Sequence, residues 1–254
     1  MLVAGQTRSL ALVAALSSLG APVVPANPAS AAAPTRSMAP SIAARSLSPA
    51  LTITIGLAVE ADVSPKLIPL MTAETDEIWR QANMTFLWQR ESPPASASAR
   101  WMPASSSPHA ELRVVVSNAV RSETERGLPL GWIAFDGPAA GGSGRAPVPE
   151  AEVYVSSASA FIMLNHAPEV VGHVNDMPLL ERDTFVARAM GRALAHELGH
   201  YLLASKTHSA KGLMRAVYTA AELFGPARLG FTIDTAQRQE IADRLLIGRR
   251  VAGR

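Results

Sequence analysis

The sequence predicts an α+β fold in which a mixed β-sheet packs against helices. The order of the expected elements is the first reason, because a strand and a helix come first, short strands follow, and two helices close the chain. Composition is the second reason. Hydrophobic residues make up 48% of the 254 residues and charged residues 17%, which is enough apolar material for a buried core and unlike a disordered chain.

The first elements are a strand over 51–60 and a helix over 65–82. Apolar residues alternate with other residues through LTITIGLAVE, which places one row of side chains on a single face, as in a half-buried strand. Pro65 suits the first turn of a helix, where a missing N–H is tolerated, and apolar residues then recur at helical spacing up to Ala82.

Short apolar segments separated by Pro- and Gly-rich stretches predict the remaining strands. We expect them at Met84–Trp88, Leu112–Ser117, Leu130–Phe135 and Glu152–Ser156. Two helices should follow. The first runs over about 184–203 with Asp183 as its N-cap, and the second runs over about 236–247 after Asp234 and Thr235.

The N-terminal region predicts export. Residues 1–33 combine Arg8, a short apolar run and A-x-A sites, which is the pattern of a cleaved signal peptide. The apolar run is shorter than the roughly 20 residues of a membrane span, so we expect no stable membrane insertion after cleavage. Residues 34–50 are rich in Pro, Ser and Ala and predict a linker, which leaves 51–254 as the folded domain. The expected location is secreted or periplasmic.

Charge and cysteine content exclude several kinds of function. The 23 Lys and Arg residues nearly balance the 21 Asp and Glu residues, and no dense basic run occurs, so we expect no nucleic-acid partner. The chain has no cysteine, which removes thiolate metal sites, disulfides and cysteine nucleophiles. Any metal ion must therefore be bound by carboxylates and by some of the six histidines.

The motif His196-Glu197-Leu198-Gly199-His200 carries the chemistry. In a helix, His196 and His200 lie one turn apart on the same face, so both imidazoles can bind one metal ion. Glu197 lies beside them and is close enough to act as the general base on a water activated by the metal. The alternative interpretation is two unrelated core histidines flanking a surface glutamate.

A catalytic zinc site needs a third protein ligand and an open position. His208, Glu222 and Asp234 are the candidates downstream of the motif. A histidine leaves the site with a higher net positive charge than a carboxylate does, and so makes an attached water more acidic.

The segment 196–214 resembles the zinc-binding signature of the metzincin metalloproteases, closest to their matrixin branch. The resemblance implies that His208 is the third ligand and that Met214 forms the Met-turn beneath the metal. The family pattern has a glycine at the position of Leu203 and the third histidine at the position of Lys206. This chain therefore departs from the pattern at both positions. We expect the helix to run slightly further and to turn at 204–206, so that a longer loop returns the histidine to the metal.

The resemblance also implies the fold, the cofactor and the reaction. It implies a zincin-like domain with a mostly parallel mixed sheet, an antiparallel edge strand, an active-site helix and a C-terminal helix. One Zn²⁺ would serve an endopeptidase reaction on a peptide or protein substrate. The substrate would lie along the edge strand formed by Gly131, Trp132, Ile133, Ala134 and Phe135.

Two other functions are consistent with the same residues. One is an inactive relative that binds zinc and captures peptides without cutting them. The other is a zinc hydrolase that acts on cell-wall amides. Tyr218 lies four residues after Met214, and this spacing does not favour a role at the transition state.

Overall fold

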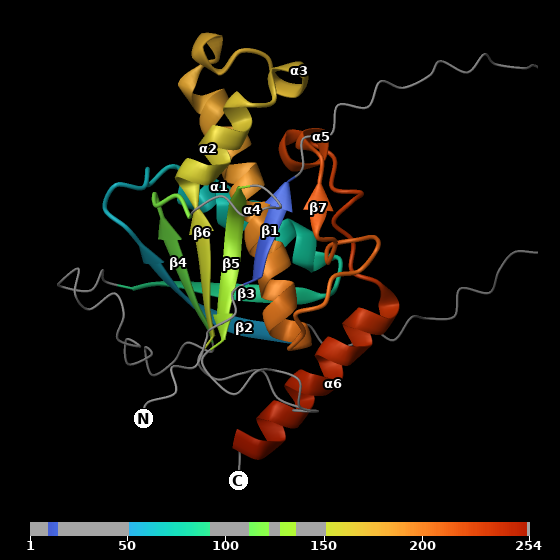
Figure 1. Cartoon of the computed structure of the whole chain (residues 1–254). Coiled ribbons are helices and arrows are strands. Elements are labelled where there is room, and N and C mark those ends of the chain that lie inside the picture. The colour runs from blue at the N-terminus through green and yellow to red at the C-terminus, as the bar shows by residue number, and fades with distance from the viewer. Residues whose placement is uncertain (1–9, 15–50, 92–111, 122–127, 136–150, 253–254) are drawn as a thin grey trace, which may run out of the picture.

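The computed structural model describes residues 10–14, 51–91, 112–121, 128–135 and 151–252. A single sheet lies beside a long central helix, and the last helix projects away from the sheet to the C-terminus (Figure 1). The expected linker over 34–50 lies outside the described residues, as do all but five residues of the expected signal peptide. No helix among the described residues is both long and apolar enough to cross a membrane.

The sheet is mixed and mostly parallel, as the sequence predicts. Its strands follow the order β3-β2-β4-β6-β5-β1-β7. The strands are β1 (Leu10–Ala14), β2 (Leu51–Val59), β3 (Met84–Arg90), β4 (Leu112–Ser117), β5 (Pro129–Phe135), β6 (Ala151–Ser156) and β7 (Val217–Tyr218). Strands β3, β2, β4 and β6 run parallel to one another, and β5 runs antiparallel to β6. Every strand expected from the sequence is present within two residues of its expected ends.

Seven helical segments accompany the sheet in the described part of the chain. They are α1 (Leu67–Arg80), α2 (Ser157–Asn165), α3 (Pro168–Val171), the short 3₁₀ helix η2 (Val174–Asp176), α4 (Leu179–Leu203), α5 (Ala220–Phe224) and α6 (Thr235–Ala252). The sequence predicts α1, α4 and α6. It does not predict α2, whose Ser- and Ala-rich sequence has almost no helical periodicity of hydrophobicity.

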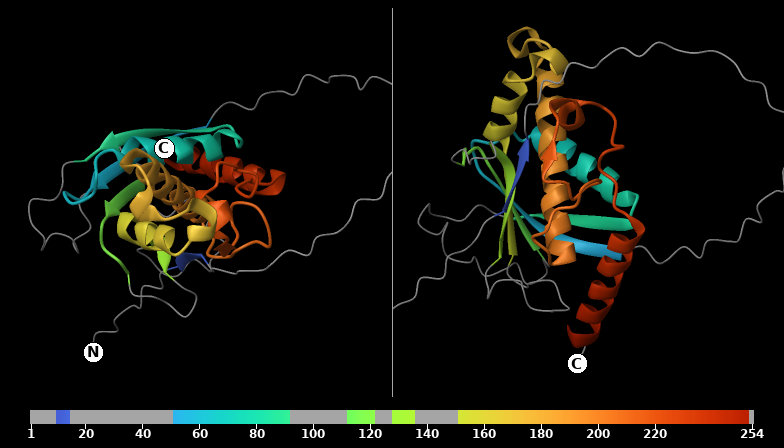
Figure 2. Two further views of the ribbon diagram at one scale, coloured as in Figure 1. Left: turned by 90° about the horizontal axis from the view of Figure 1, so that it is seen from above. Right: turned by 45° about the vertical axis from the view of Figure 1, so that its right-hand side comes forward.

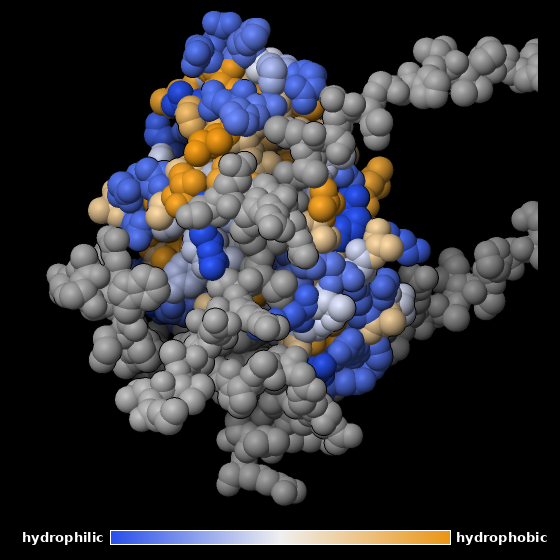
Figure 3. Space-filling model, viewed as in Figure 1, coloured by the Kyte–Doolittle hydropathy of each residue, from blue (hydrophilic) through white to orange (hydrophobic). Residues whose placement is uncertain are grey.

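The long helix α4 begins earlier than expected. It starts at Leu179 behind Pro178, so Asp183 is not its N-cap. Leu179 and Leu180 are exposed and the buried positions start only at Val186, so the first turns show no apolar stripe that a sequence pattern can detect. Figure 3 shows apolar side chains on the surface around this end of the molecule, near α2 and α3.

Helices α1 and α4 pack side by side on one face of the sheet (Figure 2). The buried residues of the strands alternate with half-exposed ones, so each strand turns a single apolar row toward these helices. A polar contact fixes the two helices against each other, because the buried indole of Trp79 donates to the carbonyl of Ala195 at 3.2 Å. Helix α4 therefore lies in the core along most of its length.

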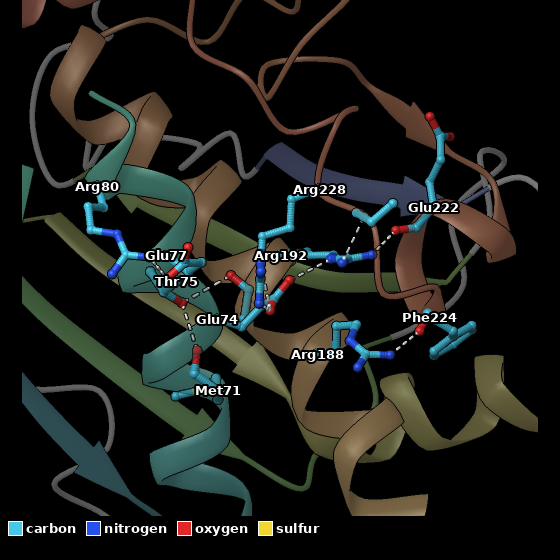
Figure 4. A network of polar contacts seen from close by, with 12 residues as sticks. Met71, Glu74, Thr75, Glu77, Arg80, Arg188, Arg192, Glu222, Phe224 and Arg228 are labelled. Carbon is cyan, nitrogen blue, oxygen red and sulfur yellow. Dashed lines mark hydrogen bonds and ion pairs between the residues drawn. The ribbon is translucent and has the colours of Figure 1, made fainter. Parts of the chain in front are cut away.

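A buried ion-pair cluster joins the two helices to the segment after α5 (Figure 4). The Glu74 carboxylate of α1 accepts from Arg192 of α4 at 2.9 Å and from Arg228 at 2.6 Å. Arg192 is fully buried and also donates to the backbone carbonyls of Glu222 and Ala227. The cluster thus connects α1, α4 and the segment 222–228, which are distant in the sequence.

Strand β1 comes from the apolar run of the expected signal peptide. It pairs antiparallel with β5 and parallel with β7. Strands β3, β2, β4, β6 and β5 form the expected mostly parallel sheet with β5 as its antiparallel edge strand, and β1 and β7 extend this sheet beyond β5. The pairing with β1 joins segments more than a hundred residues apart, which local periodicity does not reveal.

Candidate metal centre

The HExxH motif lies in the buried part of α4. His196, Glu197 and His200 each have 0% exposure, and helical spacing turns the two imidazoles toward the same point. Their ring centroids are 4.6 Å apart. The helical placement that the sequence predicts for this motif is confirmed.

The structure brings His208 to the two helical histidines. Its ring centroid lies 5.3 Å from that of His196 and 4.9 Å from that of His200. One potential ligand nitrogen from each of the three rings lies within 4.8 Å of the other two. The three histidines therefore form a group that can hold a metal ion.

Backbone carbonyls select the tautomers of the two helical histidines. Nδ1 of His196 lies 2.7 Å from the carbonyl oxygen of Leu213, and Nδ1 of His200 lies 2.7 Å from that of Ser205. A carbonyl can only accept, so each Nδ1 carries the proton and each Nε2 presents a lone pair. The two Nε2 atoms are 3.0 Å apart, which is close to the roughly 3.3 Å that two nitrogens 2.0–2.1 Å from a tetrahedral zinc ion would show.

Burial keeps these imidazoles neutral. It lowers the pKa of His196 well below its ordinary value, and the neighbouring His200 adds to the effect. Burial also lowers the pKa of His200 to about 4, against the opposing effect of its hydrogen bond to Ser205. Neutral imidazole is the form that binds a metal ion, so the fold holds these two groups in the binding form at neutral pH.

The turn after α4 explains how His208 reaches the group. The helix ends at Leu203, and Ala204 takes the left-handed conformation with φ of 44°. Its N–H donates back to Tyr201, and the N–H of Ser205 donates to the carbonyl of His200. The sequence predicts this turn at 204–206, and the structure has it at Ala204. The backbone turn that a glycine would favour is made by an alanine.

Met214 packs against α4 at Gly199, the residue before His200. It is 2% exposed, and a Cβ added to Gly199 would lie 2.3 Å from its sulfur atom. The absence of a side chain at Gly199 gives the Met side chain room to approach the helix, and a larger residue there would displace it. The N–H of Ser209 donates to the carbonyl of Met214 at 2.7 Å, which closes a tight turn directly after His208.

Strand β5 approaches the site at Gly131. A Cβ on this residue would lie 3.0 Å from the carbonyl oxygen of Tyr154 and 3.3 Å from Cγ of Glu197. A side chain at this position would push the neighbouring strand and helix apart, so glycine favours their close approach. Of the expected substrate strand, Gly131 is thus adjacent to the glutamate, whereas Trp132 points to the other face, where its ring stacks on Tyr154 at 5.1 Å.

The two carboxylate candidates for the third ligand are outside the histidine group and serve as caps. Glu222 forms a capping box with Thr219 at the start of α5 and an ion pair with Arg215 at 2.6 Å. Partial burial alone would raise the pKa of Glu222, but the Thr219 and Arg215 hydrogen bonds lower it. Asp234 accepts from the N–H of Gln237 at 2.8 Å, at the start of α6.

Tyr218 is a site residue that the spacing argument discounts. Its hydroxyl donates to the carbonyl of Leu213 at 2.5 Å, the same oxygen that accepts from His196. Burial raises the pKa of the Tyr218 phenol, so the hydroxyl remains a donor. Tyr218 is thus connected to His196 through the Leu213 carbonyl. Sequence spacing does not reveal this connection, because the hydroxyl contacts the carbonyl and not the histidine group itself.

Fold and site together define an α+β protein with a buried HExxH helix and a third histidine returned by a tight turn. No protein-family model matches the chain, and no curated protein matches it in sequence. Similar solved structures include archaemetzincin from Methanopyrus kandleri, with 13% identity, a TM-score of 0.45, and coverage of 77% of this chain and 96% of that one. Metalloproteinase-II from Bacteroides fragilis has 12% identity and a TM-score of 0.40, with 77% and 53% covered.

Proposed function

We propose that the protein is a zinc-dependent endopeptidase of metzincin type. The observation that carries the proposal is the pair of Nε2 lone pairs, 3.0 Å apart, with His208 and Glu197 beside them. Two acceptor nitrogens repel each other at this distance unless a cation lies between them.

His196, His200 and His208 would hold one Zn²⁺, which is well suited to three neutral imidazoles and an open fourth position. Bound zinc would supply Lewis acidity, which polarises the scissile carbonyl and makes a water molecule more acidic. The order His208-Ser209 before Leu213-Met214 supports the matrixin branch. The displaced histidine and the missing glycine distinguish this chain from that pattern.

Glu197 is the general base of the proposed reaction. Its carboxylate takes a proton from the attacking water and then delivers it to the leaving amine. The residue is fully buried next to the histidines, and Gly131 of β5 lies against its side chain. A peptide that runs along β5 would therefore bring its main chain close to the carboxylate and would add main-chain hydrogen bonds as an extra strand does.

Metal analysis and one substitution test this proposal. The purified protein should contain about one zinc, and chelation should remove both zinc and peptide hydrolysis. Glu197→Gln should keep the zinc and lose about 10²–10⁴ in rate, the usual contribution of a positioned acid or base. Glu181→Gln is the matched control, since Glu181 is exposed in the first turn of the same helix. Full activity in the Glu197→Gln variant would contradict the assignment.

The two other functions give different outcomes in the same assays. An inactive peptide-binding relative would contain zinc and bind peptides, but neither the native protein nor the Glu197→Gln variant would cut them. A zinc hydrolase for cell-wall amides would cut cell-wall fragments and leave linear peptides intact. Both tests use the same purified protein.

We also propose export through the segment 1–33, on the pattern of its sequence. N-terminal sequencing of protein from the extracytoplasmic fraction should find a terminus near residue 32 or 34. An intact Met1 on cytoplasmic protein would contradict export.

A further inference from the structure

We propose that Leu10–Ala14 occupies the peptide groove of its own chain, so that the intact protein is autoinhibited until this segment is displaced or removed. The inference rests on the proposed function, because it concerns the groove in which a peptide substrate would bind. It commits to one occupant, the strand β1.

Two walls of the groove are connected to the candidate metal centre. Strand β5 approaches Glu197 at Gly131. Strand β7 begins three residues after Met214, and its Tyr218 donates to the carbonyl that also orients His196. A segment that pairs with both strands therefore passes the site.

Strand β1 pairs with both walls at once. It is antiparallel to β5, with Leu10 opposite Ile133 and Ala11 opposite Trp132, and it is parallel to β7, with Val13 opposite Val217. The pairing with β5 is irregular between Ala11 and Val13, and the next pair joins Val13 to Pro129. The irregular stretch therefore faces the part of β5 that contains Gly131, beside Glu197. The main chain of the segment lies where the reacting part of a substrate would lie.

An external peptide and β1 compete for the same groups. A strand that lies between β5 and β7 uses the backbone N–H and C=O groups that these two strands turn toward the groove. Once they are used, a second extended peptide has no main-chain partners there. Because β1 is covalently attached, its binding is intramolecular, and a free peptide must compete with an effective concentration set by the tether.

The sequence of β1 also indicates what the groove accepts. The segment LALVA has no charge, proline or glycine, and it extends readily. We infer that the preferred substrates are extended peptides with uncharged, small or branched aliphatic residues. Loss of the segment by cleavage near residue 33 would remove β1 and open the groove, which would couple removal of the N-terminal segment to activity.

Proline substitutions in the full chain test the inhibition. Ala11→Pro with Val13→Pro should raise hydrolysis of an uncharged aliphatic peptide about tenfold or more, because proline removes backbone donors and strand pairing. Ser41→Pro with Ala43→Pro is the control, since these positions lie in the expected linker, outside both the described strands and the expected cleavage sites, and it should leave the rate unchanged. Zinc content should be the same in all three proteins. Equal rates in the native protein and the Ala11/Val13 variant would overturn the inference while leaving the proposed function intact.

A disulfide gives a readout that does not depend on activity. The chain has no cysteine, so Ala11→Cys with Trp132→Cys introduces a single pair at opposing positions of β1 and β5. The pair should oxidise readily in the full chain, whereas Ala11→Cys with Leu180→Cys, at an exposed distant position, should not. Failure of the Ala11–Trp132 pair to form would overturn the inference. A pair that forms in a zinc-loaded protein that never cuts peptides would support the occupied groove and reject the proposed function.

Discussion

At the scale of single residues, backbone carbonyls define the metal centre as much as the histidines do. The carbonyls of Leu213 and Ser205 come from different turns and fix which nitrogen of His196 and of His200 carries the proton. Such outer partners orient a ligand and raise its basicity. The histidines supply the chemistry, and the turns that follow α4 supply the geometry.

The third ligand is the first prediction at this scale. His208→Ala should weaken zinc binding by orders of magnitude, because its ring lies about 5 Å from both helical rings. Glu222→Ala should leave zinc affinity almost unchanged and lower stability by about 1 kcal/mol, because this residue caps α5. Zinc titrations of both variants decide the matter. A site emptied by Glu222→Ala and not by His208→Ala would place the chain among zincins with a glutamate ligand.

A second prediction concerns Tyr218 as a positioning residue. Tyr218→Phe removes the hydroxyl that holds the Leu213 carbonyl, so His196 loses a fixed partner and zinc affinity should fall about tenfold. Tyr154→Phe is the control, because its hydroxyl donates to Glu152 on the other side of the sheet. Competition with a chelator of known affinity measures both variants. Unchanged affinity in Tyr218→Phe would show that the carbonyl needs no second donor.

At the scale of elements, the end of α4 determines the path of the chain to His208. A non-glycine residue in the left-handed conformation costs roughly 1–2 kcal/mol, and Ala204 adopts this conformation. The cost is offset by the two hydrogen bonds that close the turn onto His200 and Tyr201. The turn is therefore maintained by its surroundings and not by the preference of the residue.

Ala204→Gly should accordingly stabilise the protein by up to about 1 kcal/mol, because glycine adopts this conformation without a steric cost. Zinc affinity should not decrease. Ala187→Gly in the interior of the same helix is the contrasting variant and should destabilise by about 1 kcal/mol or more. Chemical denaturation of the three proteins measures the differences. Destabilisation by Ala204→Gly would mean that the turn has another conformation in solution.

At the scale of the whole molecule, the Glu74 cluster joins the parts that the site needs. It connects α1 and α4 to the backbone carbonyls of Glu222 and Ala227 (Figure 4). The Glu222 side chain in turn pairs with Arg215, the residue after Met214. Burial lowers the pKa of Arg192, and the hydrogen bond to Glu74 opposes that shift. A buried arginine without this carboxylate would remain an uncompensated charge.

Glu74→Ala should therefore destabilise the protein by about 3–5 kcal/mol, the usual effect of removing one partner of a buried pair. Glu77→Ala is the control on the same helix. Its partner Arg80 is 72% exposed, so the pair contributes at most about 1 kcal/mol. Thermal and urea unfolding compare the two. An equal effect of both substitutions would show that the Glu74 cluster is not a structural link.

The sequence by itself determined the features that depend on neighbouring residues. Alternating apolar residues predicted the strands, and helical spacing placed His196 and His200 on one face, because side-chain direction repeats with the local backbone geometry. The turn at Ala204 was predicted from the departure from the metzincin pattern, because Leu203 stands in place of the glycine and the histidine comes two residues later. Helix α2 and the first turns of α4 lack such a pattern, since α2 has almost no amphipathic periodicity and the first turns of α4 are partly exposed, and the sequence missed them.

Only the tertiary structure decided the features that depend on distant contacts. It separated His208, which joins the two helical histidines, from Glu222 and Asp234, which cap helices. It also placed β1 between β5 and β7 and aimed the Tyr218 hydroxyl at the carbonyl that orients His196. These positions follow from loop closure and strand pairing between segments far apart in the chain. Their free energy depends on which surfaces meet, and no local pattern of residues encodes that choice.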